Sequence, residues 1–160
     1  MEYLDLYYIK NDKLTGKTMI RGGEVPEGRY FNVVICYMEN SNGEFLIQRA
    51  SIQKGHKCSS TGGHVQAGQT LKEAMVREIK EEIGIDVSED ELEFKGRWLK
   101  NNVVMCNAYY MKRDIDINEC KLQEEEVESV FWKTKEEIEE MIKDNQFFET
   151  GAKLFEDFIR

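Results

Sequence analysis

The sequence is poor in proline, histidine and paired cysteine. Its 160 residues include one proline, two histidines and four cysteines, and no two cysteines form a CxxC pair. This pattern favours reduced thiols over a zinc site or a disulfide framework. The chain also lacks an apolar run of the ~20 residues that a membrane-spanning helix needs, and its first residues lack the basic and apolar parts of a signal peptide. We therefore expect a soluble, cytoplasmic protein.

Positive charge is also scarce. Lysine and arginine number 22 against 31 acidic residues, so the formal net charge is −9. This balance disfavours general binding to nucleic acid or to an anionic membrane, because both require positive surface. An anionic small molecule stays possible as a partner, since a bound metal ion inverts the local charge. A chain of this length suits one domain, and we expect residues 1–160 to form a monomer or a homodimer.

The apolar pattern predicts alternating strands and helices. Thr70 with Glu73, and Thr134 with Glu137, have the spacing of capping boxes, and Gly84 stands where the first helix would end. Strands before, between and after helices predict an α/β sandwich with a mixed sheet. The expected strands are 3–9, 17–20, 30–38, 44–49, 93–100, 103–112 and 127–132; a turn is expected at 40–43, loops at 22–28 and 51–61, and helices at 70–84, 134–143 and 151–159.

Three carboxylates lie close together near the end of the first expected helix. At 3.6 residues per turn, Glu78, Glu81 and Glu82 fall within an arc of about 100°. Glu81 and Glu82 oppose the helix dipole, at a cost of about 0.3–1 kcal/mol each on an exposed surface. Mg²⁺ or Mn²⁺, which prefer hard oxygen ligands, would turn this repulsion into coordination. The alternative is a solvated acidic face.

A double glycine precedes this helix. Gly62 and Gly63 have no Cβ, so their backbone carbonyls can come close to an ion. The full order is Gly63, five residues, Gln69, seven residues, and then Arg-Glu-Ile-Lys-Glu-Glu-Ile-Gly-Ile at 77–85. This order resembles the signature of the Nudix hydrolase family, and Gln69 is the one departure, since the family has a glutamate there.

The resemblance implies a fold, a reaction and a set of ligands. The fold would be a Nudix-type α/β/α sandwich with a mixed β-sheet, in a single domain with N-terminal strands and a loop at 1–28 and the signature at 62–85. The reaction would be metal-dependent hydrolysis of a diphosphate linkage in a small molecule of the nucleoside-diphosphate type. The implied ion is Mg²⁺, with Mn²⁺ as the alternative, and its implied ligands are Gly63, Glu78, Glu81 and Glu82. Such an ion lowers the pKa of a water that attacks phosphorus.

The general base and the substrate contacts are less well defined. The base could be Glu78 or a glutamate of the run 124–126, with Glu126 as the candidate, although that run also suits a solvated loop. A basic loop leads to the signature, and we expect it to contact substrate phosphate through Arg49, Lys54 and Lys57. The alternative is that these charges only keep the loop soluble. Four aromatic residues could either stack on a nucleobase of the substrate or pack in the hydrophobic core: Phe31, Trp98, Tyr109 and Tyr110.

Gln69 is interpreted as a structural brace together with Arg77. It precedes Thr70, the expected N-cap, so it lies at the opposite end of the helix from the acids. A glutamine keeps a carbonyl acceptor for Arg77 but loses the charge assistance of a glutamate, a difference of about 1 kcal/mol. We therefore expect activity to survive this departure.

Two rival functions are weighed against hydrolysis. A non-catalytic nucleotide-diphosphate binder is favoured by Gln69 alone. Segments 5–7, 15–18 and 43–49 resemble the Nudix branch related to isopentenyl-diphosphate isomerase. An isomerase site of that type needs a cysteine where this chain has Gly62, and several histidines where this chain has two in all.

Overall fold

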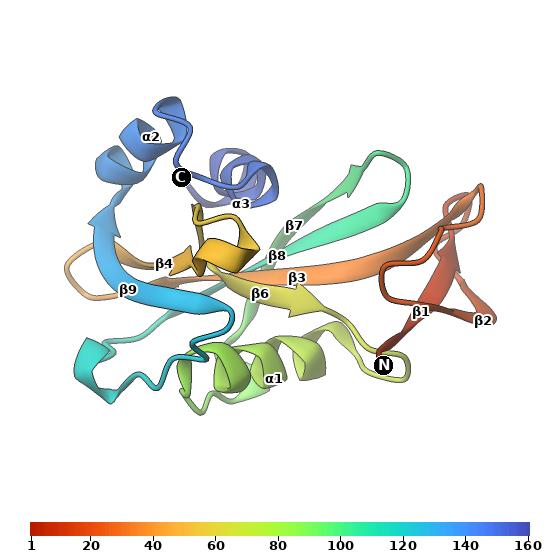
Figure 1. The fold of residues 1–160 in the computed structure, drawn as a ribbon, viewed down its shortest axis with the longest axis horizontal. Coiled ribbons are helices and arrows are strands. Elements are labelled where there is room, and N and C mark those ends of the chain that lie inside the picture. Colours follow the sequence, from red (N-terminus) through yellow and green to blue (C-terminus); the bar gives the residue numbers. More distant parts are fainter.

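A mixed β-sheet forms the centre of the molecule (Figure 1), and the computed structural model describes residues 1–160. The strands are β1 (Tyr3–Tyr8), β2 (Leu14–Ile20), β3 (Arg29–Glu39), β4 (Glu44–Ala50), β5 (Cys58–Ser59), β6 (Thr61–His64), β7 (Glu93–Lys100), β8 (Val104–Lys112) and β9 (Val127–Thr134). The α-helices are α1 (Leu71–Ile83), α2 (Lys135–Lys143) and α3 (Glu149–Leu154), and α3 continues as a π-helical turn at Phe155–Ile159. Short 3-10 turns lie at Ile52–Lys54, Glu89–Glu91 and Ile117–Glu119.

Strand β3 organises the sheet. It pairs in parallel with β8, from Phe31 opposite Val104 to Glu39 opposite Lys112, and antiparallel with β1, β4 and β6. Strand β7 continues the sheet beyond β8, and β9 pairs with β4. The sheet is therefore mixed, as the sequence predicts.

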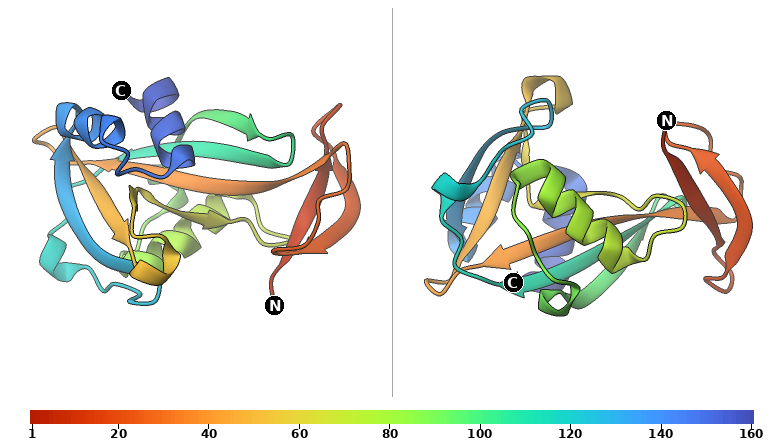
Figure 2. Two further views of the ribbon diagram at one scale, coloured as in Figure 1. Left: turned by 45° about the horizontal axis from the view of Figure 1, so that its top comes forward. Right: turned by 90° about the horizontal axis from the view of Figure 1, so that it is seen from below.

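Helices cover the sheet on its two faces (Figure 2). Alternate residues of β3 point to opposite sides, so Val34 and Cys36 pack with α1 in one core cluster while Ile35 and Tyr37 pack with α2 and α3 in another. The α1 cluster includes Ala74, Met75, Ile79 and Ile83, and the other includes Ile138, Leu154 and Phe155. This three-layer arrangement confirms the predicted α/β/α sandwich.

Helix α1 begins and ends at the capping residues that the sequence predicts. The Thr70 hydroxyl accepts a hydrogen bond from the Glu73 amide at 3.1 Å, and the Glu73 carboxylate accepts one from the Thr70 amide at 2.8 Å. The helix ends at Gly84, which adopts a left-handed φ of 74° that costs glycine little. Buried side chains at the 3.6-residue spacing then fix its inner face on the sheet.

An N-terminal hairpin, β1 with β2, stands at one end of the long strand β3 (Figures 1 and 2). Strand β1 pairs with β3 at only two positions, Tyr7 opposite Tyr30 and Tyr8 opposite Arg29. The hairpin also holds the loop that leads into α1, because the amide of Ala67 donates to the Tyr3 carbonyl and the amide of Gly68 donates to the Asp5 carboxylate. The start of the chain is thereby attached beside the carboxylate-bearing helix.

Some boundaries differ from the sequence-based expectation. The segment expected as a loop at 51–61 contains a 3-10 turn and the short strand β5, and the double glycine belongs to β6. Strand β6 pairs closely with β3, and a Cβ on Gly62 would collide with the Val34 carbonyl. Only glycine therefore fits at position 62. The second strand begins at Leu14 and the last helix at Glu149, in each case a few residues earlier than expected.

The cysteines are all free thiols. Cys36, Cys58 and Cys106 are buried, whereas Cys120 is partly exposed. This agrees with the reduced state expected from their spacing. None of the helices is both long and apolar enough to span a bilayer.

Candidate active site

The carboxylates of α1 face strand β6. A Cβ on Gly63 would collide with the carboxyl group of Glu78, so the acid lies directly over the glycine backbone. Glu82, one turn later, accepts a hydrogen bond from the Gly62 amide at 3.2 Å and one from Gln48 Nε2 at 3.3 Å. The double glycine thus lets the helix bring two acids against the sheet.

Arg77 connects the acids to the loop before the helix. Its Nη1 donates to Glu78 at 2.9 Å and to Glu81 at 3.1 Å. Its Nη2 donates to the His64 carbonyl at 2.9 Å and to Gln69 Oε1 at 3.2 Å. One guanidinium therefore fixes both carboxylates relative to the β6 backbone, and Gln69 contacts Arg77 as the sequence-based interpretation requires.

Burial of the two inner carboxylates perturbs their acidity. Loss of hydration raises the pKa of Glu78 to about 7, although the nearby Arg77 charge opposes the shift. Burial, followed by the charge of Glu78, raises the pKa of Glu82 to about 8. Half of the Glu81 side chain, by contrast, is exposed to solvent. The fold therefore holds two carboxylates where their negative charge is poorly solvated.

These residues fit a divalent cation in donor chemistry. Carboxylate and backbone carbonyl oxygens are the hard ligands that Mg²⁺ and Mn²⁺ prefer. Gly63, Glu78 and Glu82 lie together, and Glu81 is joined to Glu78 by Arg77. No three side chains of Asp, Glu, His or Cys are already arranged as metal ligands. Glu78 and Glu81 are instead both paired with Arg77.

A small polar cavity of about 250 Å³ opens beside these acids. No hydrophobic residue lines it. Its lining comprises Glu2, Arg21, Gly62, Gly63, His64, Glu78, Glu81, Glu82, Gln123 and Glu126.

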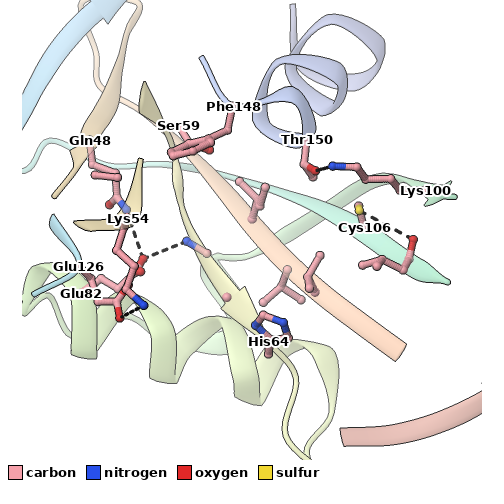
Figure 3. Close-up of a pocket in the computed structure, with 18 of the residues that line it drawn as sticks. Gln48, Lys54, Ser59, His64, Glu82, Lys100, Cys106, Glu126, Phe148 and Thr150 are labelled. Atoms are coloured by element: carbon pink, nitrogen blue, oxygen red, sulfur yellow. Dashed lines mark hydrogen bonds and ion pairs between the residues drawn. The ribbon is translucent and has the colours of Figure 1, made fainter. Parts of the chain in front are cut away.

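A larger cavity of about 540 Å³ adjoins the small one and shares Gly62, Gly63, His64, Glu82 and Glu126 with it. Figure 3 shows Lys54, Glu82 and Glu126 on one side of this cavity and Lys100 with Thr150 on the other. The Lys100 ammonium donates to Thr150 Oγ1 at 3.2 Å. The apolar part of the wall consists of Val33, Val34, Ile35, Ala50, Val104, Cys106 and Phe148. A volume of this size suits a small organic molecule.

Glu126 lies at the junction of the two cavities. Of the acidic run 124–126, it is the residue that lines both, whereas Glu124 lines a separate surface recess. Lys54 Nζ lies 3.4 Å from the Glu126 carboxylate and also lines the larger cavity. The geometry therefore brings Glu126 and Lys54 to the same place as Glu82.

Arg49 and Lys57 lie elsewhere. Arg49 Nη1 donates to the His56 carbonyl at 2.9 Å, and Lys57 Nζ donates to Asn145 Oδ1 at 3.0 Å. Neither residue lines either cavity, and Arg49 borders a recess beside Phe131. Of Arg49, Lys54 and Lys57, only Lys54 lines one of the two cavities, and its contact with substrate phosphate stays a prediction.

Several cavity residues were missed from the sequence. Gln48, Lys100, Phe148 and Thr150 come from four separate elements or connections, and no local pattern links them. Arg21 and Glu2 come from the N-terminal hairpin region. None of the aromatic residues considered for stacking on a nucleobase lines either of these two cavities: Phe31 stacks on His64, Tyr109 belongs to the α1 core cluster, and Trp98 and Tyr110 pack on the other face.

The fold is an α/β/α sandwich with an acid-bearing helix, and comparison with known proteins identifies its family. The sequence model of the NUDIX domain matches residues 29–158. The chain belongs to the NUDIX family, and the prediction of an enzyme of the Nudix pyrophosphohydrolase type is thereby confirmed. Nudix hydrolases generally use divalent metal ions.

Individual relatives agree with this assignment. An uncharacterised Nudix hydrolase of Listeria monocytogenes is 31% identical over 153 residues, covering 92% of this chain and 88% of that protein. The isopentenyl-diphosphate Delta-isomerase of Salmonella heidelberg matches over 58 residues only, at 33% identity, covering 34% of this chain and 32% of the isomerase.

Solved structures share the fold. A crystal structure of a Deinococcus radiodurans protein superposes with a TM-score of 0.80 at 24% identity, covering 99% of this chain and 100% of that one. A bifunctional NMN adenylyltransferase/ADP-ribose pyrophosphatase of Francisella tularensis, in complex with AMP and a manganese ion, has a TM-score of 0.63 at 13% identity. The superposition covers 79% of this chain and 40% of the Francisella chain.

Proposed function

We propose that this protein hydrolyses the diphosphate linkage of a nucleoside-diphosphate-type small molecule with a divalent cation. The observation that carries the proposal is the pair of buried carboxylates, Glu78 and Glu82, which line the small cavity, Glu82 at its junction with the larger one. The proposed ligands are Glu78, Glu81, Glu82 and the backbone of Gly63. Mg²⁺ is the proposed ion and Mn²⁺ the alternative.

The chemistry is addition of water to phosphorus. When bound, a divalent ion would neutralise phosphate oxygens and acidify the attacking water. The water oxygen bonds to phosphorus, the bridging P–O bond breaks, and the departing phosphate leaves with the bridging oxygen. A carboxylate takes the proton from the water. Glu126 and Glu78 both line the small cavity and both remain candidates for that base.

The other site residues position the reactants. Arg77 orients Glu78 and Glu81 through its Nη1, and Gln69 supports the same guanidinium through its Nη2. Lys54 offers a cation to substrate phosphate beside Glu126. The larger cavity would receive the organic part of the substrate.

The isomerase alternative is disfavoured at Gly62. A side chain there would collide with the Val34 carbonyl and the Ile35 side chain, so the backbone has no room for the cysteine that an isomerase site requires. The non-catalytic binder differs from the hydrolase only in turnover. Release of phosphate therefore separates the two.

The test is turnover of nucleoside diphosphates, triphosphates, sugar nucleotides and dinucleotides with Mg²⁺ and with Mn²⁺, measured by product mass spectrometry. We expect Glu81→Gln with Glu82→Gln to lower kcat by at least about a hundredfold, since metal stabilisation is worth several kcal/mol. The matched control is Glu136→Gln with Glu140→Gln, which removes two exposed acids from α2 and leaves turnover unchanged. Normal turnover of the Glu81 and Glu82 double variant at saturating Mg²⁺ would show that the metal assignment is wrong.

A further inference from the structure

The two adjoining cavities have opposite characters. The larger has seven hydrophobic lining residues and the smaller has none. Both meet at Gly62, Gly63 and Glu82. A diphosphate held at this junction therefore has space for an organic group on one side and for a compact, highly polar group on the other.

Arg21 supplies the positive charge of the small cavity. The cavity contains five carboxylates, those of Glu2, Glu78, Glu81, Glu82 and Glu126, and Arg21 is the one arginine or lysine in its lining. A phosphate monoester carries about −1.5 to −2 charges at pH 7. A terminal phosphate entering this acidic space needs a cationic partner, and a guanidinium matches phosphate oxygens in a bidentate manner.

The hairpin holds Arg21 in place while leaving most of its donors free. Arg21 directly follows β2, and its amide donates to the Glu2 carbonyl at 3.0 Å. Its Nη1 lies 2.9 Å from the Glu2 carboxylate, which also accepts a hydrogen bond from Gln66 Nε2 at 2.9 Å. The other guanidinium nitrogens bond to nothing in the chain, and 47% of the side chain is exposed.

We propose that Arg21 binds the terminal phosphate of a diphosphate monoester, and that this contact selects monoesters over diphosphates esterified at both ends. The inference rests on the proposed hydrolase function and names its substrate class. Water would then cleave the bridging P–O bond to release inorganic phosphate and the organic monophosphate. Arg21 precedes the region matched by the NUDIX domain, residues 29–158, so this specificity belongs to the N-terminal hairpin.

The alternative role for Arg21 is purely structural. Its ion pair with Glu2 ties the end of β2 to the start of the chain, although exposed ion pairs of this kind stabilise proteins little. Glu2→Gln separates the two roles, because it breaks the ion pair and keeps the guanidinium. If Arg21 only supports the hairpin, Glu2→Gln will reproduce the defect of Arg21→Ala. If Arg21 binds phosphate, Glu2→Gln will keep or improve monoester binding.

The experiment compares ribonucleoside 5′-diphosphates with the corresponding P1,P2-dinucleoside diphosphates in the presence of Mg²⁺. We expect the wild-type protein to prefer the monoesters, and Arg21→Ala to lower kcat/KM for them about ten- to a hundredfold, the effect of one charge-assisted hydrogen bond. Arg21→Lys should restore part of the loss, and activity on the diesters should change little. Lys17→Ala, which removes an exposed cation without an ion pair from the same hairpin, is the matched control and should behave as wild type. Thermal melting of each variant checks its folding.

Equal or better activity of the wild-type protein on the diesters would overturn the proposal, as would an equal loss on both substrate types in Arg21→Ala. A binding arm keeps the two proposals distinguishable. Calorimetry with a non-hydrolysable α,β-methylene nucleoside diphosphate and Mg²⁺ should show weaker binding by Arg21→Ala and unchanged binding by Lys17→Ala. If nothing is hydrolysed but this pattern holds, hydrolysis fails and the phosphate contact stands. If Arg21→Ala binds the analogue as tightly as wild type, the phosphate contact is wrong whatever the turnover.

Discussion

At the scale of single residues, Arg77 is the centre of the site. It contacts two carboxylates, one backbone carbonyl and one amide oxygen, while its Nε is buried without a partner. Gln69 Oε1 is one of these acceptors and also accepts from the Gln66 amide at 3.1 Å. The side-chain nitrogen Nε2 of Gln69 makes no hydrogen bond within the chain, so a carboxylate in place of the side-chain amide would lose no contact.

We predict that Gln69→Glu raises stability slightly and changes turnover by less than about tenfold, or 1.4 kcal/mol in the barrier. The carboxylate would keep both acceptor contacts and add charge assistance to the Arg77 bond, worth about 1 kcal/mol. Thermal unfolding, metal titration and kcat measure the effect. Gln66→Glu provides the contrast, because Gln66 Nε2 donates to Glu2 and an acid there would face another acid, which should lower the melting temperature. An inert natural protein that becomes an active hydrolase on Gln69→Glu would favour the binder function.

The signature alone was enough to predict the capping box, the close approach of other groups to the double glycine, and the contact between Gln69 and Arg77. Each of these features involves α1 or the short segment that precedes it. The sequence could not predict that Arg49 would turn to the His56 carbonyl and Lys57 to Asn145, because these partners are fixed by the path of the loop. Lys100 and Arg21 were missed for a similar reason. Their place at the cavities results from strand pairing over long distances along the chain.

At the scale of elements, α1 and α2 begin with the same N-terminal capping motif. Thr70 and Glu73 form a capping box on α1, and Thr134 and Glu137 form one on α2. The first helix carries the proposed ligands, whereas the second packs on the opposite face of the sheet. The two caps therefore allow the stability of a helix to be separated from its part in the site.

We predict that Thr70→Ala and Thr134→Ala each lower the free energy of unfolding by about 1 kcal/mol, the usual effect of losing a threonine N-cap. Both lose the bond from the N3 amide, at 3.1 Å and 3.2 Å respectively. Only Thr70→Ala should also weaken metal binding, because fraying of α1 at its start loosens the turn that carries Arg77 and Glu78. Urea unfolding and metal titration provide the two measurements. Equal metal affinity in the two variants would show that the α1 cap does not support the site.

At the scale of the whole molecule, β3 connects every part of the site. It pairs with β6, which carries the double glycine, with β8, which borders the larger cavity, and with β1 of the N-terminal hairpin. Each face of β3 also contributes to one of the two core clusters. We therefore propose that residues 1–160 unfold as one domain in a single transition.

The stability of the whole domain should depend on pH through its two buried acids. In the metal-free protein the pKa of Glu78 is about 7 and that of Glu82 about 8, against 4.5 for a free glutamate. Between pH 4.5 and 8 the folded state therefore binds more protons than the unfolded state, so stability falls as pH rises through the folded pKa values. Burial lowers the pKa of His64 to about 4, which acts in the opposite direction up to its ordinary value of 6.5. The clean window therefore runs from pH 6.5 to about 8.

We predict that the metal-free protein loses stability across this window, with a slope of at most about 1.4 kcal/mol per pH unit for each acid. A saturating divalent cation should reduce the loss, because it stabilises the ionised carboxylates that the fold keeps from water. The increase in melting temperature caused by Mg²⁺ should accordingly be larger at pH 8 than at pH 6.5. The Glu78→Gln and Glu82→Gln double variant should show neither the slope nor the rise with Mg²⁺, since both titrating groups are gone. A wild-type melting temperature that rises between pH 6.5 and 8 without metal would mean that these carboxylates are already ionised in the fold, and the predicted dependence of stability on pH would be wrong.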